Sequence, residues 1–247
     1  MLSKYIIKLE SVSSTNDYAR EILKNEAYKS DIVYVTTNEQ TKGRGQVGNI
    51  WESNKGENIT CSIIIRPNMI EIADQFNISI AVSLAIASVL EEYLPGVSIK
   101  WPNDIYVRNN KICGILIENS LIGSCIESSI IGIGLNVNQT KFSASIPNPT
   151  SLAIELKNYF NIDDIFTLIS NKIALYMSRL YNAESAGFKN EYLKKLYLKG
   201  EKSNFKAGSI FFEGIIEGIN EYGMIEIREC ISRTLMQFGF KEVEYIH

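Results

Sequence analysis

Apolar and polar residues alternate along short stretches in the first part of the chain, which is the spacing of β-strands. Such stretches lie at residues 5–9, 32–36, 59–65, 97–101, 111–118 and 129–137. Helical spacing is found at residues 17–24, after capping hydroxyls at 13–15, and at residues 71–94. Strands and helices do not alternate strictly, so the pattern predicts an α+β fold with a mixed β-sheet flanked by helices.

The hydrophobic pattern changes in the second half of the chain. Residues 151–198 have the period of helices, and alternation then returns in short strands over residues 209–246. Turns between these strands are expected at three glycines, Gly214, Gly218 and Gly223. The change of period predicts two domains, residues 1–198 and residues 199–247, the second a small β-barrel.

Composition narrows the range of functions. The chain has 247 residues and a net charge of −3, so it lacks the overall positive field that draws proteins onto nucleic acid. The longest apolar run, residues 78–90, is too short to cross a bilayer, and no secretory signal opens the chain. The four cysteines stand far apart, as in a reduced protein. We therefore expect a cytoplasmic protein that binds neither nucleic acid nor a membrane.

Histidine is almost absent, and this excludes many catalytic arrangements. The single histidine is His247, the last residue. Ser-His-Asp and Cys-His centres need a histidine in the core, and a zinc site would have to use scattered cysteines. Any chemistry must therefore use lysine, arginine, carboxylates, amides and backbone groups.

A glycine-rich segment with one arginine lies at residues 43–48 (GRGQVG). It contains the pattern G-x-G-x-x-G, but a dinucleotide-binding loop must open a helix, and residues 51–57 have the composition of a loop. Glycine amides can close over an anion while the guanidinium of Arg44 neutralises its charge. A loop that binds a phosphate-bearing ligand and a mobile surface loop both fit this composition.

Two further segments combine strands with polar or very small residues. Residues 100–106 (KWPNDIY) place polar side chains where a strand stops, which is typical of a site or of a structured turn. Residues 132–138 (GIGLNVN) have glycine at alternate positions, which lets a flat ligand or a second strand approach one face. Asn136 could then contact the edge of a base.

Together these segments resemble the biotin protein ligases. The resemblance is carried by residues 14–16 (STN), the glycine-arginine loop with Trp51, the block KWPND at 100–104, the K-x-x-G motif at 111–114, and the glycine-rich strand that ends in Asn136. The order and spacing of these motifs match over nearly the whole chain.

The resemblance implies a fold and an activity. The fold is a class II synthetase-like biotin/lipoate ligase core with a small C-terminal Src-homology-3-like β-barrel. In the implied reaction the biotin carboxylate attacks the α-phosphate of Mg-ATP, pyrophosphate leaves, and a lysine of a biotin carboxyl carrier protein attacks the mixed anhydride. ATP, Mg²⁺ and biotin are thus implied without a tightly bound prosthetic group. Pairing of two copies of the chain is left open.

The resemblance also assigns roles to residues of this chain. Lys111 is implied as the catalytic charge that bridges the carboxylate and the α-phosphate, with Arg44 closing from the loop. The implied biotin-binding residues are Ser14, Thr15, Asn16, Gln40, Gly43, Arg44, Gly45, Gln46, Trp51, Lys111 and Gly114. The implied ATP-binding residues are Arg44, Gln46, Trp51, Asn103, Asp104, Lys111 and Asn136. Asp104 is also the expected magnesium ligand.

The chain departs from the family pattern in two respects. Many members have a second arginine where this chain has Gln46, so we expect looser retention of the adenylate unless Lys42 compensates. Larger bacterial members carry an N-terminal winged helix-turn-helix, whereas here the catalytic pattern begins near residue 1. Repressor activity is therefore not expected.

Two alternative functions are considered. A lipoate-type ligase shares the fold and the adenylation chemistry, but its arginine-rich, glycine-run and histidine motif has no counterpart in this sequence. A sensor that binds biotin or a nucleotide without turnover is suggested by Gln46 and by the small C-terminal barrel. Lys111 argues against the sensor.

Overall fold

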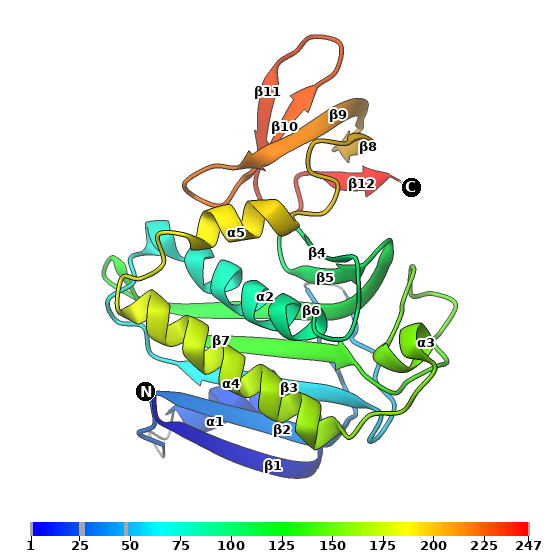
Figure 1. The fold of residues 1–247 in the computed structure, drawn as a ribbon. Coiled ribbons are helices and arrows are strands. Elements are labelled where there is room, and N and C mark those ends of the chain that lie inside the picture. The colour runs from blue at the N-terminus through cyan, green and yellow to red at the C-terminus, as the bar shows by residue number, and fades with distance from the viewer. Residues whose placement is uncertain (1, 25–27, 47–48, 247) are drawn as a thin grey trace.

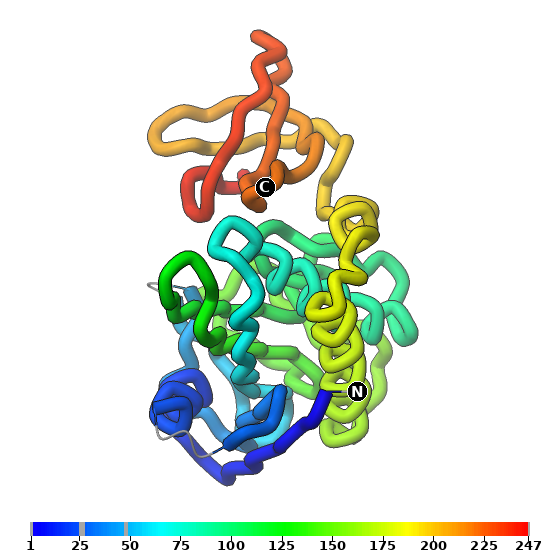
Figure 2. The backbone as a smooth tube through the Cα atoms, turned by 90° about the vertical axis from the view of Figure 1, so that its left-hand side faces the viewer, coloured from blue at the N-terminus to red at the C-terminus, as the bar shows by residue number. Residues whose placement is uncertain are grey.

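The computed structural model describes residues 2–24, 28–46 and 49–246. Val47 and Gly48 of the glycine-rich loop, and His247, lie outside the described residues. The described chain forms a large mixed sheet with helices on both faces and a smaller antiparallel sheet at one end (Figures 1 and 2). The predicted α+β class with a mixed, helix-flanked sheet is confirmed.

The large sheet has seven strands in the order β1-β2-β3-β7-β6-β5-β4. Their bounds are β1 Lys4–Val12, β2 Ile32–Gln40, β3 Asn58–Ile65, β4 Val97–Lys100, β5 Asp104–Val107, β6 Asn110–Ile122 and β7 Cys125–Asn136. Strands β1 and β2 pair in parallel, and the other neighbours pair antiparallel. β5 was not predicted, because it begins inside residues 100–106, whose composition was interpreted as the end of a strand.

Helices cover both faces of this sheet. They are α1 Thr15–Lys24, the 3₁₀ turn η1 Ile72–Asp74, α2 Phe76–Leu90, α3 Leu152–Leu156, α4 Ile162–Tyr181 and α5 Phe188–Lys195. Figures 1 and 2 show α1 on one face and α2 with α4 on the other. The predicted helical stretch 151–198 is thus three helices, since Lys157 and Ala183 adopt positive φ angles and interrupt it.

Helix α2 lies at the centre of the core. Its side chains are apolar on every side, and they pack between the sheet and α4. Among the described residues, Ile72–Leu90 is the one stretch long and apolar enough to cross a bilayer, but 61% of it is buried inside the molecule. This packing is that of a core helix, as the sequence pattern predicted.

The C-terminal segment forms a five-stranded antiparallel sheet in the order β11-β10-β9-β8-β12. Its strands are β8 Lys202–Ala207, β9 Ile210–Ile219, β10 Ile225–Glu229, β11 Leu235–Phe238 and β12 Glu244–Ile246. The predicted small C-terminal β domain is present, and within the described residues no pairing closes its strands into a barrel, because the short outer strands β11 and β12 pair only with β10 and β8. The domain boundary at residue 198 falls between α5 and β8 and stays a prediction.

Two of the three predicted glycine turns are also wrong. Gly214 and Gly218 lie inside β9, and only Gly223 is in a turn. A Cβ atom on Gly214 would come within 2.6 Å of Ile227 Cγ2 on the neighbouring strand, so this glycine permits close strand packing. Gly218 similarly lets Leu193 of α5 approach to 3.3 Å from a Cβ position.

The small sheet is attached to the end of the large one. The indole Nε1 of Trp101 donates a hydrogen bond of 2.8 Å to the carbonyl oxygen of Gly223, in the turn between β9 and β10. The Lys100 amine lies 4.8 Å from the ring centre of Tyr106 and 4.6 Å from that of Tyr245 on β12. The C-terminal sheet therefore rests directly on the KWPND turn.

Candidate functional site

A small cavity lies on the large sheet, between the start of α1, the glycine-rich loop and strands β3, β6 and β7. Its volume is about 50 Å³. It is lined by Ser14, Thr15, Gln40, Arg44, Gly45, Gln46, Trp51, Thr60, Cys61, Asn103, Asp104, Lys111, Gly114, Ile115, Leu116, Gly132, Ile133 and Gly134. Most of the residues predicted to bind biotin or ATP, from segments far apart in the sequence, therefore meet at one place.

Trp51 lies against two glycines on adjacent strands. Gly114 of β6 and Gly134 of β7 are paired across the sheet, and neither has a side chain to fill this side. A Cβ atom on Gly134 would come within 2.1 Å of Trp51 Cε2, and one on Gly114 within 3.0 Å of Trp51 Cζ3. These two glycines thus make room for the indole of Trp51. From the sequence alone, either a flat ligand or a second strand could have occupied this face.

The polar end of the cavity is fixed by residues at the start of α1. The backbone N–H and the hydroxyl of Thr15 both donate to Gln40 Oε1, at 2.9 and 3.1 Å. Ser14 is buried and caps the helix by accepting from Asp17 N–H at 3.4 Å. Gln40 keeps its amide nitrogen for another partner. The result is a set of fixed donors and acceptors inside a largely apolar pocket.

Asn16 does not line the cavity but lies beside it, on the same face of the sheet as Trp51. Its Oδ1 is 2.5 Å from Ser62 Oγ, and its Nδ2 donates 2.8 Å to Glu118 Oε2. A Cβ atom on Gly132 would come within 2.5 Å of Asn16 Oδ1, so this glycine lets the amide lie close against β7. Asn16 therefore supports one side of the pocket.

Lys111 and Asp104 form an ion pair at the other end of the cavity. Lys111 Nζ is 2.7 Å from Asp104 Oδ2, and both side chains are about three-quarters buried, with 28% and 25% exposed. The backbone of Lys111 is held by Asn148 and Thr150, whose loop crosses beside β6. The amine is fixed in place and faces the interior of the site.

Gln46 links the glycine-rich loop to the KWPND turn. Its Nε2 donates a hydrogen bond of 2.7 Å to Asn103 Oδ1. Asn103 is itself buried and donates to the carbonyl oxygen of Ile115. The residue that replaces the second family arginine thus makes a neutral contact across the cavity.

Arg44 lines the cavity, and its guanidinium is held by two carboxylates. Its guanidinium contacts Asp17 Oδ1 at 2.6 Å and Glu118 Oε1 at 3.3 Å, and no ion pair joins it to Asp104 within the described residues. Its backbone pairs with that of Ile50 in an isolated antiparallel bridge. Asp17 and Glu118 were missed from the sequence, because they are ordinary surface carboxylates until the fold brings α1 and β6 together.

Besides Asn16, two more predicted residues are outside the cavity lining. Asn136 is buried, and its amide donates 2.9 Å to the carbonyl oxygen of Thr150 instead of facing the pocket. The structure therefore does not bring Asn136 to the predicted base. Gly43 packs against the carbonyl oxygen of Trp51, which would lie 2.1 Å from a Cβ atom.

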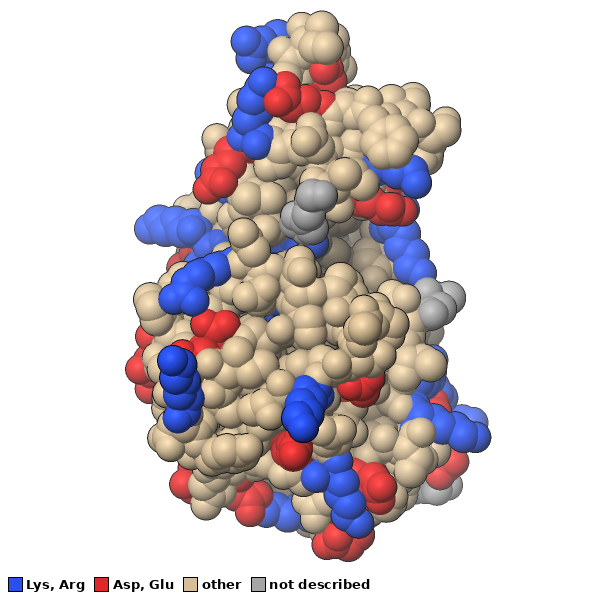
Figure 3. Space-filling view, turned by 90° about the vertical axis from the view of Figure 1, so that its right-hand side faces the viewer, with Lys and Arg blue, Asp and Glu red and all other residues tan. Residues whose placement is uncertain are grey.

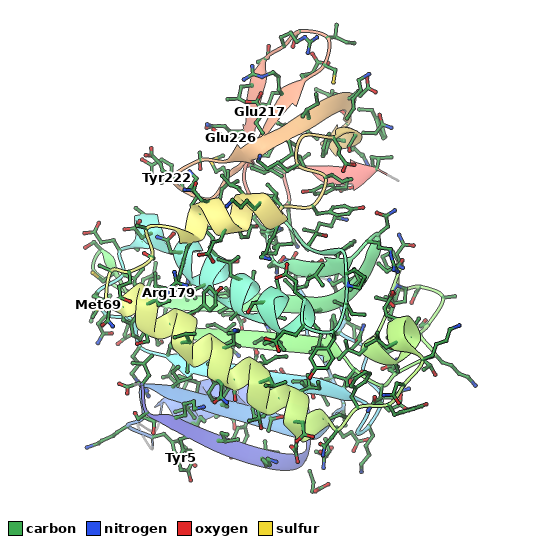
Figure 4. All side chains as sticks on the ribbon, viewed as in Figure 1. Tyr5, Met69, Arg179, Glu217, Tyr222 and Glu226 are labelled. Atoms are coloured by element: carbon green, nitrogen blue, oxygen red, sulfur yellow. The ribbon has the colours of Figure 1, made fainter. Side chains whose placement is uncertain are left out.

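A second, larger groove of about 740 Å³ adjoins the cavity. The two share Arg44, Gly45, Gln46, Asn103 and Leu116. The far wall of the groove comes from the C-terminal sheet, where Tyr222 and Phe240 line it. Figure 4 shows Tyr222 at the end of that sheet nearest the catalytic part. The cavity and the groove therefore adjoin each other where Gln46 contacts Asn103.

The described residues contain no group of three or more histidine, cysteine, aspartate or glutamate side chains that could hold a metal ion. Asp104 offers one carboxylate, which Lys111 also contacts. A Mg²⁺ ion is commonly held by one or two carboxylates together with substrate phosphates. The site therefore fits a magnesium ion that arrives with a nucleotide.

Residues 9–136 match the Biotin/lipoate A/B protein ligase family. The chain belongs to this family. The bifunctional ligase/repressor BirA of Bacillus subtilis is 34% identical over 141 residues, which are 56% of this chain and 42% of BirA. The chain thus matches less than half the length of that relative. A biotin–[acetyl-CoA-carboxylase] ligase of Paracoccus denitrificans is 27% identical over 92% of this chain and 96% of its own length.

Solved structures of the family share the fold. The biotin protein ligase from Aquifex aeolicus, solved in complex with biotin and ATP, superposes with a TM-score of 0.81 and covers 98% of both chains at 24% identity. The superposition includes the C-terminal sheet as well as the family core. The overall architecture is therefore that of a biotin protein ligase, including its small final sheet.

Proposed function

We propose that this protein is an ATP-dependent biotin protein ligase. It forms biotinyl-5′-AMP from biotin and ATP and then transfers biotin to a lysine of a biotin carboxyl carrier protein. The observation that carries the proposal is the position of Lys111, a fixed and mostly buried amine in a pocket whose other end holds Thr15 and Gln40. Family membership and the full-length Paracoccus relative support the same activity.

The cavity suits biotin. The ureido ring is neutral and polar, and it needs fixed donors and acceptors, which Ser14, Thr15 and Gln40 supply. The rest of the molecule is apolar and is matched by Trp51 and by the branched side chains of β6.

The larger groove suits the nucleotide. It joins the cavity where Gln46 and Asn103 meet, so a phosphate there would be close to the carboxylate end of biotin. Lys111 attracts both negative reactants and lowers the energy of the charge that develops as the carboxylate attacks the α-phosphate. Asp104 directs the amine through their ion pair, and it would supply one oxygen to the magnesium ion that ATP brings.

Transfer needs no covalent link to the enzyme. The acceptor amine attacks the acyl carbon of the mixed anhydride, the bond to AMP breaks, and an amide forms. A lysine amine must lose a proton for this, and the AMP phosphate or solvent can take it. The single histidine of the chain is therefore not required for the reaction.

We propose the cytoplasm as the location, supported by four free cysteines and the use of ATP. We propose no nucleic-acid partner: the net charge is −3, and lysine and arginine side chains are interspersed with carboxylates on the face in Figure 3. Every residue named for the two steps comes from one chain, so pairing of two copies stays a prediction and is not needed for the reaction.

The deciding experiment is transfer of radiolabelled biotin to the carrier domain of a biotin-dependent carboxylase in the presence of Mg-ATP. We expect labelled carrier and release of pyrophosphate. Parallel reactions replace biotin with radiolabelled lipoate or omit ATP. A carrier that is labelled by lipoate but not by biotin would indicate a lipoate-type ligase. Tight binding of biotin without labelling of the carrier would indicate a sensor.

A further inference from the structure

Four charged side chains form a closed ring next to the glycine-rich loop. Asp17 Oδ1 accepts from Arg20 at 2.8 Å and from Arg44 at 2.6 Å. Glu118 Oε1 accepts from the same two arginines, at 2.9 and 3.3 Å. Each guanidinium therefore bridges both carboxylates. The ring joins three separate parts of the chain: helix α1, strand β6 and the loop.

Glu118 also connects this ring to one side of the cavity. Its second oxygen, Oε2, accepts from Asn16 Nδ2, and Asn16 contacts Ser62. Ser62 Oγ lies 2.8 Å from Thr15 Oγ1, which bonds to Gln40 in the cavity. A continuous chain of polar contacts thus runs from the pocket to the guanidinium of Arg44.

The ring depends on two arginines, and lysines in their place could not form the same contacts. A guanidinium has a fork of N–H donors that reaches two carboxylates at once, whereas a lysine amine has one nitrogen. Burial alone would raise the pKa of Asp17, but the hydrogen bonds from Arg20 and Arg44 outweigh it and lower that pKa. The side chains are 28–42% exposed, so each pair alone is weak, and the strength of the ring lies in its shared contacts.

We propose that Glu118 is a positioning residue, and that with Asp17 it holds Arg44 as the anchor of the glycine-rich loop. Anchored here, and tied by Gln46 to Asn103, the loop backbone lies over the cavity. Arg44 then acts on biotin through the position of its loop, and Lys111 is the cation that faces the reacting groups. The link between loop position and biotin binding rests on the proposed function, whereas the ring and its effect on the loop do not.

The first experiment measures how often the loop opens, without any substrate. Endoproteinase Lys-C cleaves after exposed lysines, and Lys42 lies at the base of the loop. Cleavage of a transiently opened segment follows the population of the open form. We expect Glu118→Gln to raise the initial rate of cleavage after Lys42 about fivefold, since loss of one charged member weakens a partly exposed network by a modest amount. Asp17→Asn should have a similar effect.

A matched control uses a similar ion pair far from the site. Glu217 contacts Arg228 through both oxygens on the C-terminal sheet, where Figure 4 labels it. Glu217→Gln should leave cleavage after Lys42 unchanged. Far-ultraviolet circular dichroism of every variant verifies that it is folded, and Asp17→Asn takes the place of Glu118→Gln if the latter does not fold.

The second experiment separates an anchor from a catalytic cation by steady-state kinetics. For an anchor, Glu118→Gln and Arg44→Met each raise the KM for biotin about fivefold with kcat within twofold, and the double variant is no worse than either single one. Arg44→Lys should resemble Arg44→Met, because an amine cannot bridge both carboxylates.

Opposite results would overturn the proposal. If Glu118→Gln and Asp17→Asn leave the cleavage rate at that of the native protein, the ring does not hold the loop. If Arg44→Met instead lowers kcat about a hundredfold, with Arg44→Lys active and Glu118→Gln normal, then Arg44 acts directly on the reactants. Failure of the native protein to label any carrier would refute the proposed function, and the cleavage result would still decide the anchor.

Discussion

Replacement of Gly134 by alanine tests the packing of the cavity floor. The added methyl group would lie 2.1 Å from Cε2 and 2.4 Å from Nε1 of Trp51, and real Cβ atoms do not approach that closely. The backbone at Gly134 belongs to β7, which is hydrogen-bonded on both sides and cannot easily move away. The indole must therefore leave its position against the sheet.

The loss of stability caused by Gly134→Ala can be estimated. Extra methyl groups in a packed interior typically destabilise by about 1–3 kcal/mol, which corresponds to a drop in Tm of about 5 °C for a chain of this size. The displaced indole should also block the cavity, so we expect biotin affinity to fall at least about tenfold, or about 1.4 kcal/mol. Thermal unfolding followed by circular dichroism gives the first quantity, and calorimetric titration with biotin gives the second.

A matched control and a double variant make the test specific. Gly187→Ala adds the same methyl group where the nearest atom is 3.7 Å away, so it should leave the Tm unchanged within about 1 °C. Trp51→Ala removes the clash, so Gly134→Ala should cost about 1 kcal/mol less in that background. Equal stability of Gly134→Ala and Gly187→Ala, or strict additivity with Trp51→Ala, would show that the indole does not lie where we describe it.

Three more predictions follow from charged groups. Lys111→Ala should slow pyrophosphate release roughly a hundredfold, equivalent to about 3 kcal/mol of transition-state stabilisation, and near-normal turnover in a folded variant would refute its role. Because the pKa of Asp17 is lowered, its contribution to stability is present above its ordinary value of 3.8 and is lost as the pH falls through the lowered pKa. The difference in unfolding free energy between the native protein and Asp17→Asn should thus be constant near neutral pH and vanish in acid, and a difference that grows in acid would contradict this sign. Lys100→Met should lower the free energy of unfolding by urea by about 1 kcal/mol, because it removes the cation between Tyr106 and Tyr245, whereas Lys100→Arg should keep most of it.

Much of the fold could be predicted because its signals are local. The strand 59–65 and the buried helix ending near residue 90 have long, unambiguous patterns, and both are present as β3 and α2. The small C-terminal sheet was anticipated from the return of alternation. Gly214 and Gly218 were misplaced, because a glycine that permits close packing and a glycine in a turn look alike in a sequence.

The site was predictable where its residues stand in unusual sequence and not where they are ordinary. Lys111, Gln40 and Trp51 follow recognisable motifs, and all line the cavity. Asp17 and Glu118 lie in a helix and a strand where surface carboxylates are common. Their role depends on the packing of α1 against β2, β3 and β7, which no local pattern encodes. The two carboxylates that hold Arg44 were therefore missed, and its role at the reacting groups stays a prediction.

Helix α2 imposes an order on synthesis. Its apolar surface is covered by the sheet on one side and by α4 and α5 on the other. These two helices come later in the chain, after strands β4 to β7. In a nascent chain that has emerged only as far as β7, one face of α2 therefore exposes apolar side chains to solvent. Fragments cut before Ile162 should accordingly precipitate or recruit chaperones, so shortened versions of this protein have to keep α4 to remain in solution.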